Sequence, residues 1–170
     1  YRMPGVKIIS PMTPEEYNLA YESFMSEDEV YYVSEHRGSY DNKEELKDFL
    51  YDDADIVIFS ISITRFTAQK VKNTLEKENI KVNLANILWI KPFEVKEQWL
   101  RSLKNSKYGG IILDDDYESG VASDMAYKLM KSSNKTVEVM GLKDKSAGFS
   151  KKTDNLPPSE EEIIKKIKKI

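Results

Sequence analysis

The chain has 170 residues, enough to bury a core of its own, and its 40% hydrophobic and 32% charged residues exclude disordered and fibrous classes. Its formal net charge of −3 gives no reason to expect a nucleic-acid partner, and without a signal-peptide pattern or long apolar run we expect no membrane partner. The absence of cysteine excludes disulfides and thiolate chemistry, and it predicts a reducing, cytoplasmic location.

The first residues predict a strand followed at once by a helix. Residues 6–9 are apolar and β-branched apart from one lysine, and Pro11 ends this strand. Thr13 is expected to cap the helix, Pro14 suits its first position, and Glu16 is expected to complete a capping box. Because a buried-looking strand starts about six residues into the chain, we expect a piece of a longer protein.

Strands and helices alternate along the rest of the chain. After a helix over 14–25 and a strand over 30–33, residues 41–53 mix acidic and basic side chains and predict a linker with a short helix. The run 56–61 is almost entirely apolar, which is typical of a strand covered on both faces. The remaining predicted elements are strands over 80–88, 109–113 and 136–139, helices over 64–78, 94–104, 120–132 and from 159 onward, and irregular structure over 141–158.

The order of these elements determines the expected fold class. Strands that alternate with helices predict a three-layer α/β/α sandwich with a mostly parallel sheet and right-handed crossovers. Such sheets bind ligands outside the carboxyl ends of their strands. The segments that directly follow strands are therefore the first candidates for a functional site.

Three aspartates, Asp114, Asp115 and Asp116, follow the predicted strand over 109–113. Clustered carboxylates at a strand end can hold Mg²⁺ or include a phosphoacceptor. The alternative is a solvated turn whose acids lie near the N-terminus of the next helix, where the helix dipole favours negative charge. We favour the solvated turn, because a receiver-type site also needs acids after other strands and a late lysine, which we do not find.

His36, the only histidine, and Arg37 follow the second predicted strand and precede Gly38. An arginine beside a glycine at a strand end can present its fork to a phosphate or carboxylate, and the glycine allows a ligand to approach the backbone. The alternatives are an exposed histidine without a role and an ordinary surface ion pair of Arg37 with Glu35 or Asp41.

The C-terminal residues 159–170 contain four lysines and a row of isoleucines, a pattern also found in membrane-surface helices. Ser159 and Glu162 predict a capping box, and the acids precede the lysines as the helix dipole favours. A closing helix that is docked on the domain explains this pattern, so a membrane surface is not needed.

The common catalytic signatures are missing from the chain. It has no GxGxxG, GxxxxGK[ST] or GxSxG motif and no cluster of histidine or cysteine. The residues alone therefore predict no catalytic group, no cofactor-binding residue and no metal ligand in this chain.

The order of short motifs resembles the C-terminal part of thiamine-diphosphate enzymes of the transketolase superfamily, most closely the β subunit of the first component of 2-oxo acid dehydrogenase complexes. That subunit carries segments like PGLKVVxPSTP, LEHRLLY and VVVEExxxxGGxGAEIA, to which residues 4–14, 34–40 and 111–126 are similar. The other similar segments are 82–94, 141–144, the Phe149-Ser150 pair and 157–163. The resemblance covers nearly the whole chain in order.

The resemblance implies a division of the chain into three parts. Residues 1–40 would be the last β-α-β of a pyrimidine-binding domain, residues 41–53 a linker, and residues 54–170 a transketolase C-terminal-like domain. It also implies thiamine diphosphate and Mg²⁺ in the intact enzyme. The family's cofactor-activating glutamate and diphosphate-binding residues would precede residue 1, so we expect this chain alone to bind neither.

The chain departs from the family's pattern at three places. Ala122 replaces the second glycine of a turn, and Asp124 replaces its glutamate. Residues 26–29 replace an RDxNP loop that helps to bind a structural potassium ion in some members, so we do not assign that site to this chain.

The resemblance implies that Arg37 and His36 bind substrate at the entrance of the intact enzyme, and that the chain supplies subunit contacts but is not catalytic in isolation. The implied partners are a second copy in a homodimer or other subunits in an α/β hetero-oligomer, and an acyltransferase core for a 2-oxo acid dehydrogenase. Two alternatives stay open. They are a non-enzymatic α/β docking module, and the C-terminal section of a ketose-transferring transketolase or a deoxyxylulose-phosphate-synthase-like enzyme.

Overall fold

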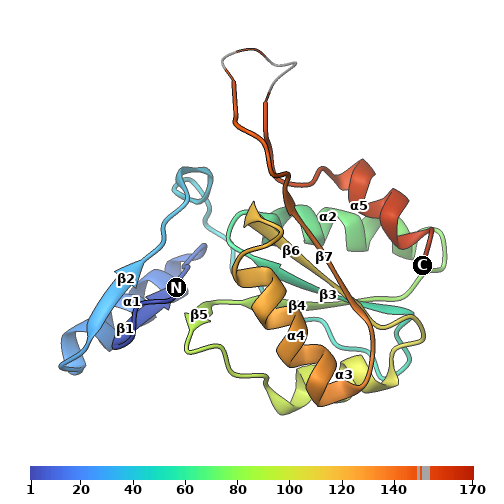
Figure 1. Ribbon diagram of the computed structural model, residues 1–170. Coiled ribbons are helices and arrows are strands. Elements are labelled where there is room, and N and C mark those ends of the chain that lie inside the picture. Colours follow the sequence, from blue (N-terminus) through green and yellow to red (C-terminus); the bar gives the residue numbers. More distant parts are fainter. Residues whose placement is uncertain (149, 151–153) are drawn as a thin grey trace.

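The strands form two β-sheets, a larger one from the later residues and a smaller one that includes the first residues (Figure 1). The computed structural model describes residues 1–148, 150 and 154–170. In the larger sheet four strands run parallel in the order β4-β3-β6-β7. These strands are β3 (Ile56–Ile61), β4 (Val82–Ile87), β6 (Gly110–Tyr117) and β7 (Val137–Leu142).

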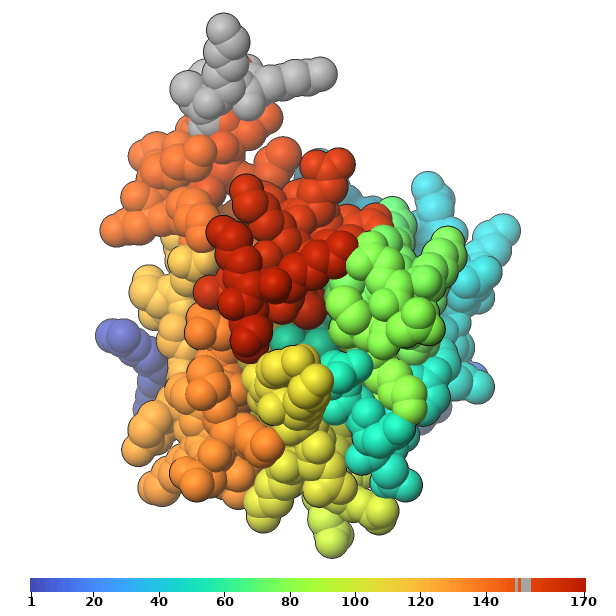
Figure 2. Space-filling view, turned by 90° about the vertical axis from the view of Figure 1, so that its right-hand side faces the viewer, coloured from blue at the N-terminus to red at the C-terminus, as the bar shows by residue number. Residues whose placement is uncertain are grey.

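Helices cover both faces of the larger sheet. One face carries α2 (Thr64–Glu76) and α5 (Glu160–Ile167), and the other carries α3 (Glu97–Asn105) and α4 (Val121–Ser133). Figure 2 shows the C-terminal helix α5, in red, lying beside α2, in green. The predicted three-layer α/β/α sandwich with a mostly parallel sheet is therefore confirmed.

Alternate residues of β3 belong to two separate cores. Val57, Phe59 and Ile61 pack with α3 and α4, whereas Ile56 and Ile58 pack with α2 and α5. All six residues of β3 are buried, as the continuous apolar run predicted.

The smaller sheet has the order β2-β1-β5 and contains the first residues of the chain. Its strands β1 (Val6–Ile9) and β2 (Val30–Val33) are parallel and are connected by α1 (Pro14–Ser26), as predicted. The third strand, β5 (Trp89–Lys91), runs antiparallel to β1 and comes from the later part of the chain. This strand was not predicted, because three residues give no detectable periodicity.

Residues 41–53 contain no helix, so the predicted short helix is wrong. The segment instead lies along the open edge of β4. The amide of Phe49 donates to the carbonyl of Leu84 over 2.9 Å, and the amide of Leu84 donates back over 2.8 Å. Tyr51 continues the contact by donating its amide to Asn83 Oδ1 over 2.7 Å. These bonds satisfy backbone groups that a bare edge strand would expose, which explains the extended conformation.

Both predicted helix caps can be checked in the structure. The capping box of Ser159 and Glu162 at the start of α5 is present, as predicted. At α1 the hydroxyl of Thr13 accepts from the amide of Glu16 over 3.4 Å. The carboxylate of Glu16 accepts from the amide of Met12 instead of that of Thr13, so the predicted box at α1 is wrong. Among the described residues no helix is both long and apolar enough to cross a membrane.

Candidate functional site

Arg37 lies in a single turn of 3-10 helix, η1 (Arg37–Ser39), shortly after the carboxyl end of β2. Its side chain is exposed, and its guanidinium forms no hydrogen bond or ion pair with any described residue. Neither Glu35 nor Asp41 pairs with it, so the surface ion pair considered as an alternative does not form. Glu35 instead accepts from the hydroxyl of Tyr40 over 3.2 Å. A guanidinium without an internal partner keeps its donors available for an external anion.

His36 holds the turn that carries Arg37. Its Nδ1 accepts from the amide of Gly38 over 3.0 Å, and its carbonyl accepts from the hydroxyl of Ser39 over 2.8 Å. The half-buried imidazole therefore caps the turn, a role that the sequence did not predict. The structure therefore places His36 and Arg37 in one turn, in which the histidine fixes the backbone that carries the arginine side chain.

The turn contacts both α1 and the residue that precedes α2. The hydroxyls of Tyr17 and Ser39 are 3.1 Å apart. A Cβ added to Gly38 would lie only 2.9 Å from Ile63 Cδ1, so the turn packs directly against the residue that precedes α2. A larger residue at Gly38 would have to displace Ile63.

A second candidate lies between the two sheets, where the carboxyl ends of β1, β2, β3 and β6 meet. The cavity there has a volume of about 250 Å³. It is lined by residues of both sheets, among them Ser10, Tyr32, Ser34, Ser62, Asp114 and Asp115. It lies beside the β3–β6 pair, where the order of the larger sheet reverses, and parallel sheets commonly bind ligands at that point.

Asp114 is the most buried acid at this cavity. It lies within β6 and is only 3% exposed, so the prediction of a solvated turn at Asp114 is wrong. Burial raises the pKa of its carboxyl from 3.8 to about 7, against the hydrogen bond from the amide of Asp116 and with the help of the charges on Asp115 and Asp116. Asp115 accepts from the hydroxyl of Ser62 over 2.6 Å. No three acidic or histidine side chains of the described residues converge as metal ligands, here or elsewhere.

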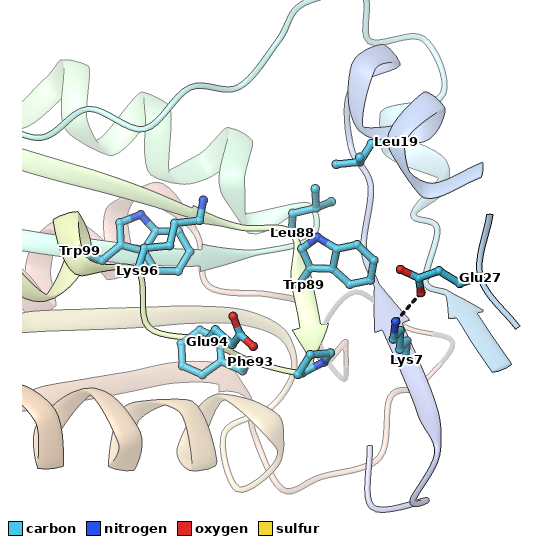
Figure 3. Close-up of a pocket in the computed structure, with 10 residues that line it drawn as sticks. Lys7, Leu19, Glu27, Leu88, Trp89, Phe93, Glu94, Lys96 and Trp99 are labelled. Carbon is cyan, nitrogen blue, oxygen red and sulfur yellow. Dashed lines mark hydrogen bonds and ion pairs between the residues drawn. The ribbon is translucent and has the colours of Figure 1, made fainter. Parts of the chain in front are cut away.

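A third cavity, of about 450 Å³, lies on the α1 side of the smaller sheet (Figure 3). Trp89, Phe93 and Trp99 form much of its wall, and an ion pair of Lys7 with Glu27 closes one side. The hydrogen bond between these two side chains lowers the pKa of Glu27 and raises that of Lys7. The sequence did not predict this cavity because the cavity depends on β5, although the two tryptophans that follow the predicted strand 80–88 are a signal for it.

The family of the chain follows from its sequence. Residues 48–162 match the model of the family described as "Transketolase, C-terminal domain". The chain belongs to the transketolase C-terminal domain family. The superfamily named from the short motifs is thereby confirmed. The match begins within the segment predicted as a linker, and the boundaries 1–40, 41–53 and 54–170 stay predictions. Phe149 of the Phe-Ser motif lies outside the described residues.

Solved structures share the fold of this transketolase C-terminal domain. One, described as "Split gene transketolase, inactive beta4 tetramer", has a TM-score of 0.74 at 14% identity and covers 99% of this chain. A transketolase from Campylobacter jejuni has a TM-score of 0.70 at 15% identity, and a Pichia stipitis transketolase in complex with sedoheptulose 7-phosphate has 0.71 at 14% identity; each covers 99% of this chain. The chain spans 58%, 27% and 25% of the three proteins. No curated protein matches the chain.

Proposed function

We propose that this chain is the C-terminal portion of a thiamine-diphosphate-dependent, transketolase-like enzyme, in which it supplies a subunit interface and one wall of the substrate entrance. The observation that carries the proposal is the free guanidinium of Arg37 at the carboxyl end of β2. An arginine binds a phosphate or carboxylate through two parallel hydrogen bonds. No anionic side chain of the described residues competes for Arg37.

The cofactor would be held outside this chain. The described residues offer no cluster of three ligands for the Mg²⁺ that accompanies a diphosphate. In the proposed enzyme the groups that bind and activate thiamine diphosphate belong to the parts that precede this portion. This chain's own residues then bind and orient the anionic end of the substrate, and they pack against the part that holds the cofactor.

The surface of residues 1–40 supports a partner of this kind. The strand β2 lies at the edge of the smaller sheet, so one row of its backbone groups has no neighbouring strand in the described part of the chain. Val30 and Tyr32 on this strand are 62% and 61% exposed, and Phe24 and Met25 at the end of α1 are also exposed. Unpaired edges with apolar side chains are typical of surfaces that a further strand or subunit covers. A second copy or another subunit of a hetero-oligomer would bury this surface.

The substrate is proposed to be a small anion with a ketone. A 2-oxo acid fits the resemblance to the dehydrogenase β subunit, and a ketose phosphate fits a ketose-transferring relative. Arg37 can bind either the carboxylate or the phosphate, so the two substrates are separated by kinetics with both compounds on the intact enzyme.

Replacement of Arg37 in the intact enzyme tests the proposal. Arg37→Ala should raise the KM for the anionic substrate more than it lowers kcat, because contacts at an entrance bind substrate and transition state alike. A charged hydrogen bond is worth about 1.5–3 kcal/mol, so kcat/KM should fall roughly ten- to a hundredfold.

The matched control is Arg101→Ala, which removes the same charge from α3. The side chain of Arg101 is 70% exposed and forms an ion pair with Asp52. The control should leave kcat/KM unchanged. Equal kinetics of the Arg37 and Arg101 variants would refute the role of Arg37.

A second candidate function is a non-enzymatic docking module. The aromatic cavity beside β5 favours it, because Trp89 and Phe93 offer an apolar site that the entrance does not use. Mixing the chain with a polypeptide that carries the pyrimidine- and diphosphate-binding parts, and assaying turnover of both candidate substrates, decides between the two. Turnover that requires this chain supports the enzyme, and binding without turnover supports the docking module.

A further inference from the structure

Arg65, in the first turn of α2, is almost completely buried and forms a two-armed ion pair with α1. Its Nη1 is 2.7 Å from Glu16 Oε2, and its Nη2 is 2.5 Å from Glu16 Oε1. The side chains of Arg65 and Glu16 are 1% and 14% exposed. An arginine fork that meets both oxygens of one carboxylate fixes the distance and the relative orientation of the two groups.

Asn86 of β4 extends this pair to the segment 41–53, which lies along the edge of β4. Arg65 donates from Nε to Asn86 Oδ1 over 3.3 Å, and Asn86 donates from Nδ2 to the carbonyl of Lys47 over 2.8 Å. The amide of Asn86 also donates to Asp48 Oδ1 over 2.7 Å. One buried network therefore joins α1, α2, β4 and the segment 41–53.

Both residues of the ion pair are close in sequence to residues that contact the turn carrying Arg37. Glu16 is followed by Tyr17, whose hydroxyl contacts Ser39 at the end of that turn. Arg65 is two residues after Ile63, against which Gly38 packs. Both partners of the ion pair are thus one or two residues away from the groups that support the turn.

We propose that Arg65 is a positioning residue whose ion pair with Glu16 locks residues 1–40 onto the α/β domain and thereby sets the place of Arg37. The consequence for substrate binding rests on the proposed function, whereas the lock itself does not. A buried guanidinium is tolerated only when its charge is paired, so arrangements that separate α1 from α2 are strongly disfavoured. Loss of the pair should let the first 40 residues move relative to the domain.

The absence of cysteine allows this motion to be measured directly. Glu22→Cys in α1 and Lys131→Cys in α4 introduce two labelling sites at exposed positions, and the chain has no other thiol. Pulsed dipolar spectroscopy between two spin labels then gives the distribution of distances between the two regions. The labelled chain with Arg65 and Glu16 intact should give one narrow distribution of distances between the labels.

Arg65→Met in this labelled chain should widen the distribution about twofold or more, because the carboxylate of Glu16 is left without its partner. Glu16→Gln should widen it similarly. The charge-reversed pair Glu16→Arg with Arg65→Glu should restore a narrower distribution. The matched control Arg101→Met, which breaks the exposed ion pair with Asp52, should leave the distribution unchanged.

Circular dichroism establishes that each variant is folded. If Arg65→Met does not fold, Arg65→Lys replaces it, because lysine keeps the charge without the fork and should widen the distribution by a smaller amount. A folded variant at Arg65 with the native distribution overturns the proposal, and so does equal widening by Arg101→Met.

Kinetics of the intact enzyme separate the lock from its consequence. Arg65→Lys should raise the KM for the anionic substrate several-fold with a smaller change in kcat, and it should add little to an Arg37→Ala variant because both act on one contact. A wider distribution with an unchanged KM would keep the lock and refute the claim that the lock sets the place of Arg37. A changed KM with a native distribution would refute the lock.

Discussion

Residues 1–40 and residues 54–170 bury their apolar side chains to very different extents. Among the described residues, sixteen large apolar or aromatic side chains are exposed, and nine of them lie in the first 40 residues, against five in 54–170. The buried apolar residues of the first region are only Ile9, Met12 and Ala20, whereas the later region has two cores on the two faces of its sheet. The later region therefore has two extensive cores, and the first region has none of comparable size.

The difference in burial bears on the stability of each region. The α/β domain can provide most of the stability by itself, since large contiguous cores dominate the folding free energy. The strand β5 and the buried Arg65–Glu16 pair join the first region to the later one. The first region leaves one sheet edge and many aromatic side chains uncovered by the described residues. These uncovered groups are the ones that the proposed subunit interface would bury.

The largest effect is expected on the free energy of unfolding, when one phenylalanine from each region is replaced by alanine. Phe59 is fully buried and meets Trp99 edge to face with ring centres 6.1 Å apart, whereas Phe24 is 48% exposed and meets Tyr31 at 6.0 Å. Phe59→Ala should lower the free energy of unfolding by about 3–5 kcal/mol, and Phe24→Ala by about 1 kcal/mol or less. Urea denaturation measures both. Equal losses would contradict the view that only the later region has a full core.

The next effect concerns Asp114, which lies at the cavity between the two regions. Its pKa of about 7 in the folded chain exceeds the ordinary 3.8, so the folded state binds this proton more tightly than the unfolded state. Its contribution to stability is present below about pH 4 and is lost as the pH rises to about 7, with a total loss of up to about 4 kcal/mol. Asp114→Asn should remove this pH dependence and stabilise the chain at pH 8.

Urea denaturation between pH 4 and pH 8 tests this expectation. Asp41→Asn, at an exposed carboxyl, serves as the control and should keep the native pH dependence. An Asp114→Asn chain that loses stability with pH as steeply as the native chain would show that folding does not raise the pKa of Asp114.

A substitution at the open edge of β2 is expected to have the smallest effect on the free energy of unfolding but a clear effect on association. Val30→Lys should change the free energy of unfolding by less than about 0.5 kcal/mol, because Val30 is 62% exposed. It should weaken association with the partner polypeptide roughly tenfold, since a lysine on an edge strand opposes pairing with a further strand. Analytical ultracentrifugation measures the association.

Tyr127→Lys is the matched control from the other region, because Tyr127 lies on α4 and is 59% exposed. It should alter neither folding nor association. If it weakens association as much as Val30→Lys, the interface is not confined to the first region.

The sequence predicted those parts of the molecule that depend on local patterns. The continuous apolar run of β3 and the capping box of Ser159 appear where they were expected. The resemblance together with the strand end directed attention to Arg37 and His36. Predicting that these two residues follow a strand required only the order of the strands and helices along the chain.

The remaining features depend on contacts between distant residues. Glu16 has the spacing of a capping box, but its carboxylate binds Arg65, which lies 49 positions later. Residues 41–53 have a mixed charge pattern that does not reveal pairing of Phe49 with β4. Asp114 looks like a turn residue because the extension of β6 beyond residue 113 is decided by pairing with β7, not by the local sequence. Tertiary contacts override local propensity at each of these positions.

The proposed function is tested most directly by calorimetric titration of thiamine diphosphate with Mg²⁺. The titration is made first into this chain alone and then into its complex with the polypeptide that carries the pyrimidine- and diphosphate-binding parts. The expected result is no saturable heat for the chain alone and saturable binding for the complex. Binding to the chain alone with a micromolar Kd, about −8 kcal/mol, would contradict it. So would a stable complex that gives no saturable heat.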